Sequence, residues 1–283
     1  MKTGNMSKPQ AWLVRSSLCL AISLTMLVNR ASAVSTLTDG NTSASIDTST
    51  QAGMFNWIVD GQDILAQQWF WYRVGSAGPE SSINTISAPV NSSLGANHLK
   101  SVYASASFSL SVEYLLSGGA PLSGLANLNE SIAIHNTTAA PLAFHFFQYS
   151  DFDLGPGGDN VQLGTNIFGK FNLADQVNSA SFNFAESVST PGADHGQVGF
   201  FPGILNSLND GATTTLSDFA GPIGPGDATW AFQWDVILSP AGQSGDTFLI
   251  SKLKHIELVP EPSSIALGLM GLAGINWIRR RRS

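Results

Sequence analysis

The chain has 283 residues and a formal net charge of −7, and charged residues make up only 12% of it. Eight of the thirteen basic residues lie in residues 1–33 and 279–282, so residues 34–258 keep five basic and nineteen acidic residues, a net charge of −14. An acidic surface of this kind repels nucleic acid, which excludes a nucleic-acid partner. The low charge density, with abundant Ser, Thr, Asn and Gly, favours a secreted β protein over a cytosolic enzyme.

Residues 1–33 have the pattern of a Sec signal peptide. Basic residues come first, an apolar run follows at 18–28, and Ala31 and Ala33 then form a small-residue cleavage site. The alternative, a permanent N-terminal membrane anchor, is disfavoured because the apolar run is short. The single cysteine, Cys19, falls inside this segment, so a processed chain contains no disulfide.

The body, residues 34–258, alternates polar and apolar residues with a period of two in most of its segments, which indicates strands. We predict strands at 44–47, 54–59, 64–74, 107–116, 130–136, 142–152, 161–168, 180–188, 228–238 and 247–258. The Asp60-Gly61 pair predicts a tight turn after the second of these. Residues 64–74 carry four consecutive aromatic residues, so we expect a central strand covered on both faces.

The strands at 130–136 and 142–152 are predicted to form a hairpin, in which His135 and His145 would face each other. Gly and Pro cluster at 155–158 and 221–226, which indicates loops, and one or two helical turns are expected at 202–208. The fold class is therefore all-β. We predict a single large antiparallel β-sandwich, of jelly-roll or supersandwich type, flanked by a signal helix and a C-terminal membrane helix.

Asp151, Asp153 and Asp159 form the candidate metal site. The first two project to the same side at the end of a predicted strand, and a Gly-rich turn folds the third back towards them. Such an oxygen cluster suits Ca²⁺, although the spacing does not fit an EF-hand loop. The alternative is an acidic strand end whose Asp residues only make turns. No other cofactor is expected.

The catalytic motifs that sequence can reveal are absent: the chain has no G-x-S-x-G, H-E-x-x-H, P-loop or dinucleotide fingerprint. We therefore predict that the protein is not an enzyme. A polysaccharide-active enzyme is the lesser alternative, and it needs two carboxylates in one cleft. The aromatic segments at 67–73 and 230–234 allow a carbohydrate-binding module with exposed rings, although alternating aromatics more often fill a core.

The last 25 residues, 259–283, have three parts in a fixed order. The first is an extended motif at 259–262 that contains Pro260, Glu261 and Pro262, since proline disfavours helix and keeps the preceding residue extended. The second is an apolar stretch at 264–278, roughly 22 Å long as a helix and therefore a short membrane span. The third is a cluster of four arginines, Arg279, Arg280, Arg281 and Arg282, which should stay on the cytoplasmic side.

This tail resembles the PEP-CTERM sorting signal of Gram-negative bacteria, in which a Pro-Glu-Pro motif precedes a short membrane helix and an Arg-rich end. The resemblance covers the tail alone. It implies that an integral-membrane exosortase cuts near the motif after export through the Sec machinery.

Together these observations predict an exported surface or extracellular-matrix protein, transiently anchored in the inner membrane and then released to the cell surface or beyond. The body is expected to be a structural or exopolysaccharide-associated component. A carbohydrate-binding module is the alternative function.

Overall fold

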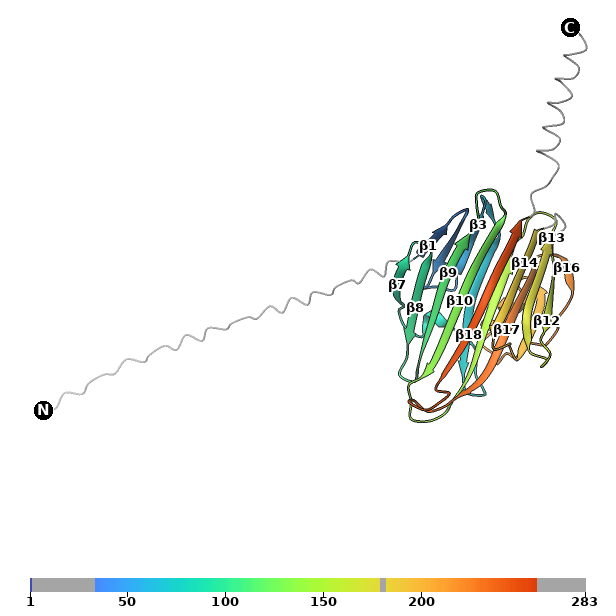
Figure 1. Ribbon diagram of the computed structural model, residues 1–283. Helices are drawn as coiled ribbons and strands as arrows, with labels where there is room; N and C mark the ends of the chain where they lie inside the picture. Colours follow the sequence, from blue (N-terminus) through green and yellow to red (C-terminus); the bar gives the residue numbers. More distant parts are fainter. Residues whose placement is uncertain (2–33, 179–181, 259–283) are drawn as a thin grey trace, which may run out of the picture. The chain divides into compact units, whose positions relative to one another are not determined.

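The computed structural model describes Met1 and residues 34–178 and 182–258, and this part of the chain is all-β (Figure 1). Its strands form two sheets of nine strands each, within the described ranges. Sheet A has the order β1-β2-β3-β5-β11-β17-β15, with β4 beside β3 and β6 beside β5. Sheet B has the order β16-β12-β13-β14-β18-β10-β9-β8-β7. The pairings are antiparallel except for the short parallel contact of β3 with β5.

The strands of sheet A are β1 Val34–Asp39, β2 Thr42–Asp47, β3 Gly53–Val59, β4 Gln62–Asp63, β5 Leu65–Val74, β6 Ser81–Ser82, β11 Leu142–Phe152, β15 His195–Phe200 and β17 Ala228–Leu238. Those of sheet B are β7 Val90–Gly95, β8 His98–Ala104, β9 Phe108–Gly118, β10 Leu125–Asn136, β12 Asp159–Thr165, β13 Phe171–Asn178, β14 Phe182–Thr190, β16 Ile223–Gly226 and β18 Thr247–Leu258. The helical elements are the 3₁₀ turn η1, Ile83–Thr85, and the short helix α1, Gly203–Asn209.

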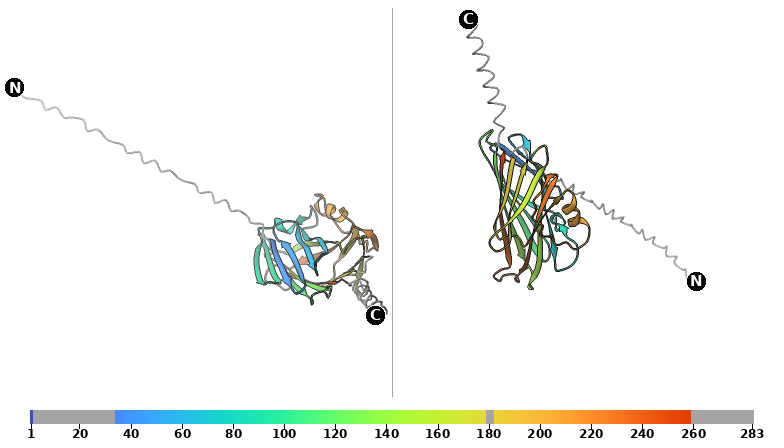
Figure 2. Two further views of the ribbon diagram at one scale, coloured as in Figure 1. Left: turned by 90° about the horizontal axis from the view of Figure 1, so that it is seen from above. Right: turned by 90° about the vertical axis from the view of Figure 1, so that its right-hand side faces the viewer.

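The two sheets pack face to face over one aromatic core, and the view from above shows them as two layers (Figure 2). Phe152 of β11 stacks on Phe184 of β14, with ring centroids 3.9 Å apart. Phe144 of β11 meets Phe108 of β9 edge to face at 4.9 Å. Because these pairs join the two sheets, neither sheet buries its apolar face without the other.

Strand β5 is central and covered on both faces, as predicted. Trp69, Phe70 and Trp71 follow one another along the strand and all three are fully buried. Since successive strand residues point to opposite faces, something must cover the outer face of sheet A as well. Helix α1 lies there, on the outside of the sandwich (Figure 2), and Asn209 at its end accepts a hydrogen bond from the Trp71 indole at 3.2 Å.

The predicted turn at Asp60-Gly61 is confirmed. Both residues have positive φ angles, 49° and 87°, and Val59 pairs with Gln62 across them. The Asp60 carboxylate also accepts hydrogen bonds from the backbone N–H of Leu122 and Gly124, at 2.7 and 2.8 Å. This turn in sheet A therefore holds the β9–β10 connection of sheet B.

The predicted hairpin of 130–136 with 142–152 is wrong. Strand β10 lies in sheet B between β9 and β18, whereas β11 lies in sheet A between β5 and β17. The chain crosses from one sheet to the other between them. The Gly- and Pro-rich segment expected to be a loop at 221–226 also forms part of a strand, the edge strand β16, which pairs with β12.

Several predicted features lie outside the described residues. These are the signal segment 1–33 with its cleavage residues Ala31 and Ala33, and the tail 259–283 with Pro260, Glu261, Pro262 and the arginines Arg279, Arg280, Arg281 and Arg282. Among the described residues, no helix combines the length and the apolar character needed to cross a membrane.

Candidate functional site

The strongest candidate site is a group of three carboxylates where β11 ends and β17 begins. These antiparallel strands are neighbours, and Asp151 near the end of β11 pairs with Thr229 near the start of β17. Asp153 follows β11 directly, and Asp227 directly precedes β17. The register between β11 and β5 also shifts at this end, an irregularity of the kind that redirects side chains at sheet ends.

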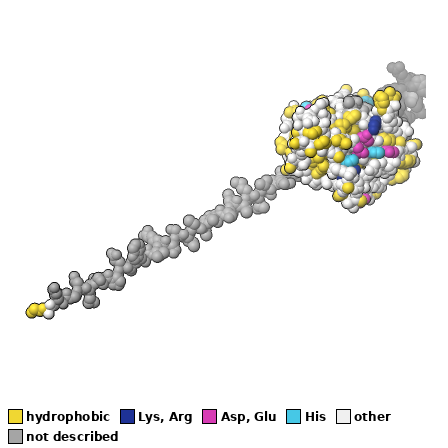
Figure 3. Space-filling model, turned by 90° about the horizontal axis from the view of Figure 1, so that it is seen from below, with side chains coloured by type: hydrophobic (Ala, Val, Ile, Leu, Met, Phe, Trp, Pro, Cys, Tyr) yellow, Lys and Arg dark blue, Asp and Glu magenta, His cyan; other side chains and the backbone are white. Residues whose placement is uncertain are grey.

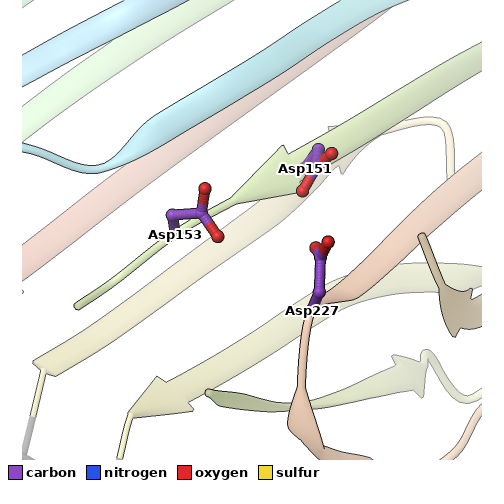
Figure 4. Close-up of side chains that lie close together, drawn as sticks. All are labelled: Asp151, Asp153 and Asp227. Atoms are coloured by element: carbon purple, nitrogen blue, oxygen red, sulfur yellow. The ribbon is translucent and has the colours of Figure 1, made fainter. Parts of the chain in front are cut away.

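The three side chains point towards one another (Figure 4). One carboxylate oxygen from each of Asp151, Asp153 and Asp227 lies within 4.8 Å of the other two. Asp151 is only 5% exposed, whereas Asp153 and Asp227 are exposed to solvent. Together with Ala66, Gln67 and Phe201, they line a cavity of about 280 Å³.

Burial and the neighbouring charges of Asp227 and Asp153 raise the pKa of Asp151 to about 7. The Tyr149 hydroxyl donates a hydrogen bond to Oδ2 of Asp151 at 3.2 Å, which opposes this rise. The other oxygen, Oδ1, is buried and has no hydrogen-bond partner in the described part of the chain. Burial and the charge of Asp227 also raise the pKa of Asp153.

Asp159, the third residue of the predicted calcium site, lies next to this group but uses its carboxylate differently. It accepts hydrogen bonds from the Leu154 backbone at 3.0 Å, the Gln176 amide at 2.7 Å and the Asn178 amide at 2.7 Å. It is only 3% exposed. These bonds hold the Gly-rich turn against β13, so Asp159 contributes its charge to the site while Asp227 supplies the third clustered carboxylate.

Sequence reasoning missed Asp227 because the residue is remote along the chain from Asp151 and Asp153. One signal was present: Asp227 stands immediately before the predicted strand 228–238, as Asp151 stands at the end of 142–152. The wrong hairpin prediction prevented this inference, because it paired 142–152 with 130–136 instead of with 228–238. Pairing it with 228–238 would have brought the three acids to one edge.

A second polar group lies at the opposite end of the same two strands. His145 of β11 hydrogen-bonds Asp235 of β17 at 2.5 Å, and His195 of β15 lies 3.4 Å from the other oxygen of Asp235 and 3.0 Å from Asp218. Burial alone would raise the pKa of Asp235, but hydrogen bonds from Gln233 and His145 and the two histidines lower it. The view from below shows acidic, histidine and basic side chains gathered on one surface (Figure 3).

The predicted approach of His135 to His145 is wrong, for the same reason as the hairpin. His135 lies in sheet B, where its ring hydrogen-bonds Thr247 of β18 at 2.9 Å. His145 lies in sheet A and bonds Asp235 instead.

The aromatic segments do not form an exposed sugar-stacking platform. Five tryptophans are described and all are fully buried: Trp57, Trp69, Trp71, Trp230 and Trp234. Two of their indole N–H groups donate to buried hydroxyls, from Trp57 to Thr42 at 2.9 Å and from Trp69 to Ser82 at 2.7 Å. The prediction that the alternating aromatics at 67–73 and 230–234 fill the core is therefore confirmed for the described tryptophans, and the alternative of exposed rings is wrong.

Similarity to solved structures shows the fold. A protein from Escherichia coli K12 described as an aldose 1-epimerase shares 11% identity, with 80% of this chain and 99% of that chain covered and a TM-score of 0.54. An aldose epimerase homologue from C. elegans shares 7% identity over 81% of this chain and 100% of that one, with a TM-score of 0.51. A bacterial glucoamylase complexed with acarbose shares 8% identity over 84% of this chain and 34% of that one, with a TM-score of 0.55. At these identities the likeness concerns the fold alone.

No curated protein matches the chain. The PEP-CTERM protein-sorting motif matches residues 258–282, which contain the Pro-Glu-Pro sequence and the arginine cluster. The chain therefore carries a PEP-CTERM protein-sorting motif, and this motif implies export and recognition by exosortase.

Proposed function

We propose that this protein is a non-enzymatic component of the bacterial surface or extracellular matrix that associates with exopolysaccharide. The observation that carries the proposal is the sorting motif at residues 258–282, directly after the last strand of a folded β body. A motif in that place delivers the body, rather than the tail, to the outside of the cell.

The proposed route has three steps. The signal peptide, residues 1–33, takes the chain through the Sec machinery and is removed after Ala33. The apolar stretch 264–278 then holds the body at the inner membrane, while the arginines at 279–282 stay in the cytoplasm. Exosortase cuts near Pro260, Glu261 and Pro262 and releases the body.

Association with polysaccharide is supported by the proteins that share the fold, which include one described as an aldose 1-epimerase and a glucoamylase complexed with acarbose. Nine strands in each sheet favour the supersandwich over the jelly roll, which has eight strands in all. Because the described tryptophans are buried, contact with sugars would not use stacked indole rings and would rely on other side chains, hydrogen-bonding ones among them. A carbohydrate-binding module is the second candidate, and the same shared fold favours it.

A non-enzymatic role is supported by the sequence, which contains no G-x-S-x-G, H-E-x-x-H, P-loop or dinucleotide fingerprint.

The sorting step is tested by replacing Pro260, Glu261 and Pro262 with alanine in the full chain and fractionating the cells. The unaltered protein is expected at the surface or in the medium, with a C-terminus that mass spectrometry finds cut near the motif. The triple variant should stay in the membrane with its arginines intact, and Ser263→Ala is the matched control. Full-length, uncut protein in the cytosol would contradict the proposal.

The polysaccharide step needs its own experiment. Protein recovered from the medium is mixed with the exopolysaccharide of the producing strain and sedimented. Co-sedimentation is expected, together with altered surface polymer in a deletion strain. A deletion strain with normal polymer and normal biofilm would contradict a matrix role even if sorting is confirmed.

A further inference from the structure

We propose that Asp151, Asp153 and Asp227 bind a divalent cation of the calcium class at the junction of β11 and β17. This proposal goes beyond the proposed function, because it concerns the body itself and holds whether or not the body meets polysaccharide.

The first argument is geometric. Ca²⁺ takes oxygen ligands at about 2.3–2.6 Å, so two oxygens on the same ion stand at most about 5 Å apart. The three carboxylates offer one oxygen each within 4.8 Å of the others. A single ion placed between three such oxygens lies within about 2.8 Å of each, so small side-chain rotations bring all three to coordination distance.

The second argument is independent of the clustering. Asp151 is only 5% exposed, and its Oδ1 atom has no hydrogen-bond partner within the described ranges. Buried polar oxygens are nearly always satisfied in folded proteins, so this one calls for a partner. Asp151 points towards Asp153 and Asp227 (Figure 4). A cation held among the three carboxylates would be the missing partner of the buried Oδ1 atom.

The third argument is the local charge. No Lys, Arg or His of the described segments forms an ion pair with any of the three carboxylates, although such pairs neutralise acids elsewhere in the sandwich. The hydrogen-bonded Asp159 adds its charge and further raises the pKa of Asp151 and Asp153. This concentration of negative charge favours a bound cation.

The cavity also has room for the rest of a coordination shell. Calcium takes six to eight oxygens, and three carboxylates supply at most six. The cavity of about 280 Å³ leaves space for waters, and Gln67 lies on its wall. We expect calcium rather than magnesium. Mg²⁺ needs a near-ideal octahedron of ligands, and carboxylates at the end of one strand and beside two strand ends are not arranged as one, whereas Ca²⁺ accepts irregular geometry.

The test uses the full-length chain, freed of metal with a chelator and titrated with CaCl₂ in a calorimeter. One Ca²⁺ per chain is expected, with a dissociation constant of about 1 mM or below, the range of extracellular sites. A second reading uses Tb³⁺, whose emission should be sensitised by Tyr149, because the Tyr149 hydroxyl lies 3.2 Å from Asp151. Added CaCl₂ should displace the bound Tb³⁺ and so decrease its sensitised emission.

The variants are Asp227→Asn and Asp153→Asn, both at exposed positions where a change of charge leaves the core intact. Each should weaken calcium binding by at least about tenfold, because each removes a charged ligand. Asp175→Asn, a partly exposed acid on β13 of the other sheet, is the matched control and should bind as the unaltered chain does. Failure of the unaltered chain to bind, or unchanged affinity in both variants, would overturn the proposal.

Discussion

Two buried carboxylates in this sandwich show how neighbours decide the charge of an acid. Glu130 of β10 is fully buried, as Asp151 nearly is, but two lysines of β18 contact it: Lys252 at 2.7 Å and Lys254 at 2.6 Å. Burial alone would raise its pKa, yet the two lysines lower it to about 2. Asp151 has acids rather than lysines for neighbours, so burial and the charges of Asp227 and Asp153 together raise its pKa to about 7.

We therefore expect Glu130→Gln to be strongly destabilising. The substitution keeps the shape of the side chain but removes the negative charge that contacts both Lys252 and Lys254, and breaking a buried pair in this way costs about 3–5 kcal/mol. Urea unfolding followed by tryptophan fluorescence measures the change in the free energy of unfolding. Glu113→Gln on the adjacent strand β9 is the control, because its partners Lys100 and His98 are part-exposed and such pairs are worth at most about 1 kcal/mol.

The contact of Glu130 with Lys252 and Lys254 also predicts how stability depends on pH. Because the folded-state pKa of Glu130 is lowered from 4.5 to about 2, its contribution to stability is complete above pH 4.5 and is lost as the pH falls towards 2. Over that interval the unaltered protein should lose stability more steeply than Glu130→Gln. Parallel slopes for the two proteins would show that Glu130 is not held ionised by its lysines.

At the scale of elements, alternation of residues along the chain located the long strands well. Strands β5, β9, β11, β17 and β18 begin and end within about two residues of the predicted ranges. Short or polar strands such as β7 and β15 were not predicted from the sequence. Their Ser, Gly and Gln residues do not alternate with apolar residues, so they give no signal of period two. Their partners in the sheet, rather than their own sequences, make them strands.

Pairing was harder to predict than the strands themselves. The short connection between 130–136 and 142–152 fits a hairpin, but a short connection also fits a crossing between two packed sheets. The sequence contains no local signal that separates these cases, since both strands are apolar on alternate residues. The carboxylate site depended on this pairing, which explains why two of its three residues were predicted and Asp227 was not.

Asn136 is the residue that supports the crossing. Its side-chain amide donates to the carbonyls of Ala140 and Ser239, both at 2.8 Å, and its Oδ1 accepts from the backbone N–H of Thr138 at 2.9 Å. The residue is fully buried, so these bonds satisfy the backbone of two loops that leave different sheets.

Asn136→Ala should therefore cost about 1–3 kcal/mol, the desolvation penalty of leaving buried carbonyls and an N–H without partners. Asn129→Ala, at an exposed position on the same strand, should change stability by no more than about 0.5 kcal/mol. Denaturant unfolding of both variants measures the difference. Equal effects of the two substitutions would show that the crossing does not depend on Asn136.

At the scale of the whole molecule, the two sheets share one core. The buried apolar residues of both form a continuous cluster, and aromatic pairs cross between the sheets at Phe152 and Phe184 and at Phe144 and Phe108. The body has no disulfide to hold it, since Cys19 is the only cysteine. Its stability therefore rests on apolar burial that each sheet provides for the other.

This shared core predicts that the two sheets unfold together, and Phe152 is the position to test. It is 1% exposed and lies between Phe184 of sheet B and Trp230 of sheet A, with ring centroids 3.9 and 6.5 Å away. Phe152→Ala should cost about 3–5 kcal/mol through lost burial and the cavity left behind. Phe168→Ala, at a position 80% exposed, is the control and should change little.

The unfolding of both proteins is followed with two probes. Far-UV circular dichroism reports all strands. Tryptophan fluorescence reports mainly sheet A, because four of the five described tryptophans lie in β5 and β17 and the fifth in β3. If the core is shared, both signals should move to lower denaturant by the same amount and keep coinciding midpoints. A fluorescence midpoint that shifts while much of the dichroism stays in place would mean that sheet B holds together alone. The crossing aromatic pairs would then be contacts between two separately stable layers.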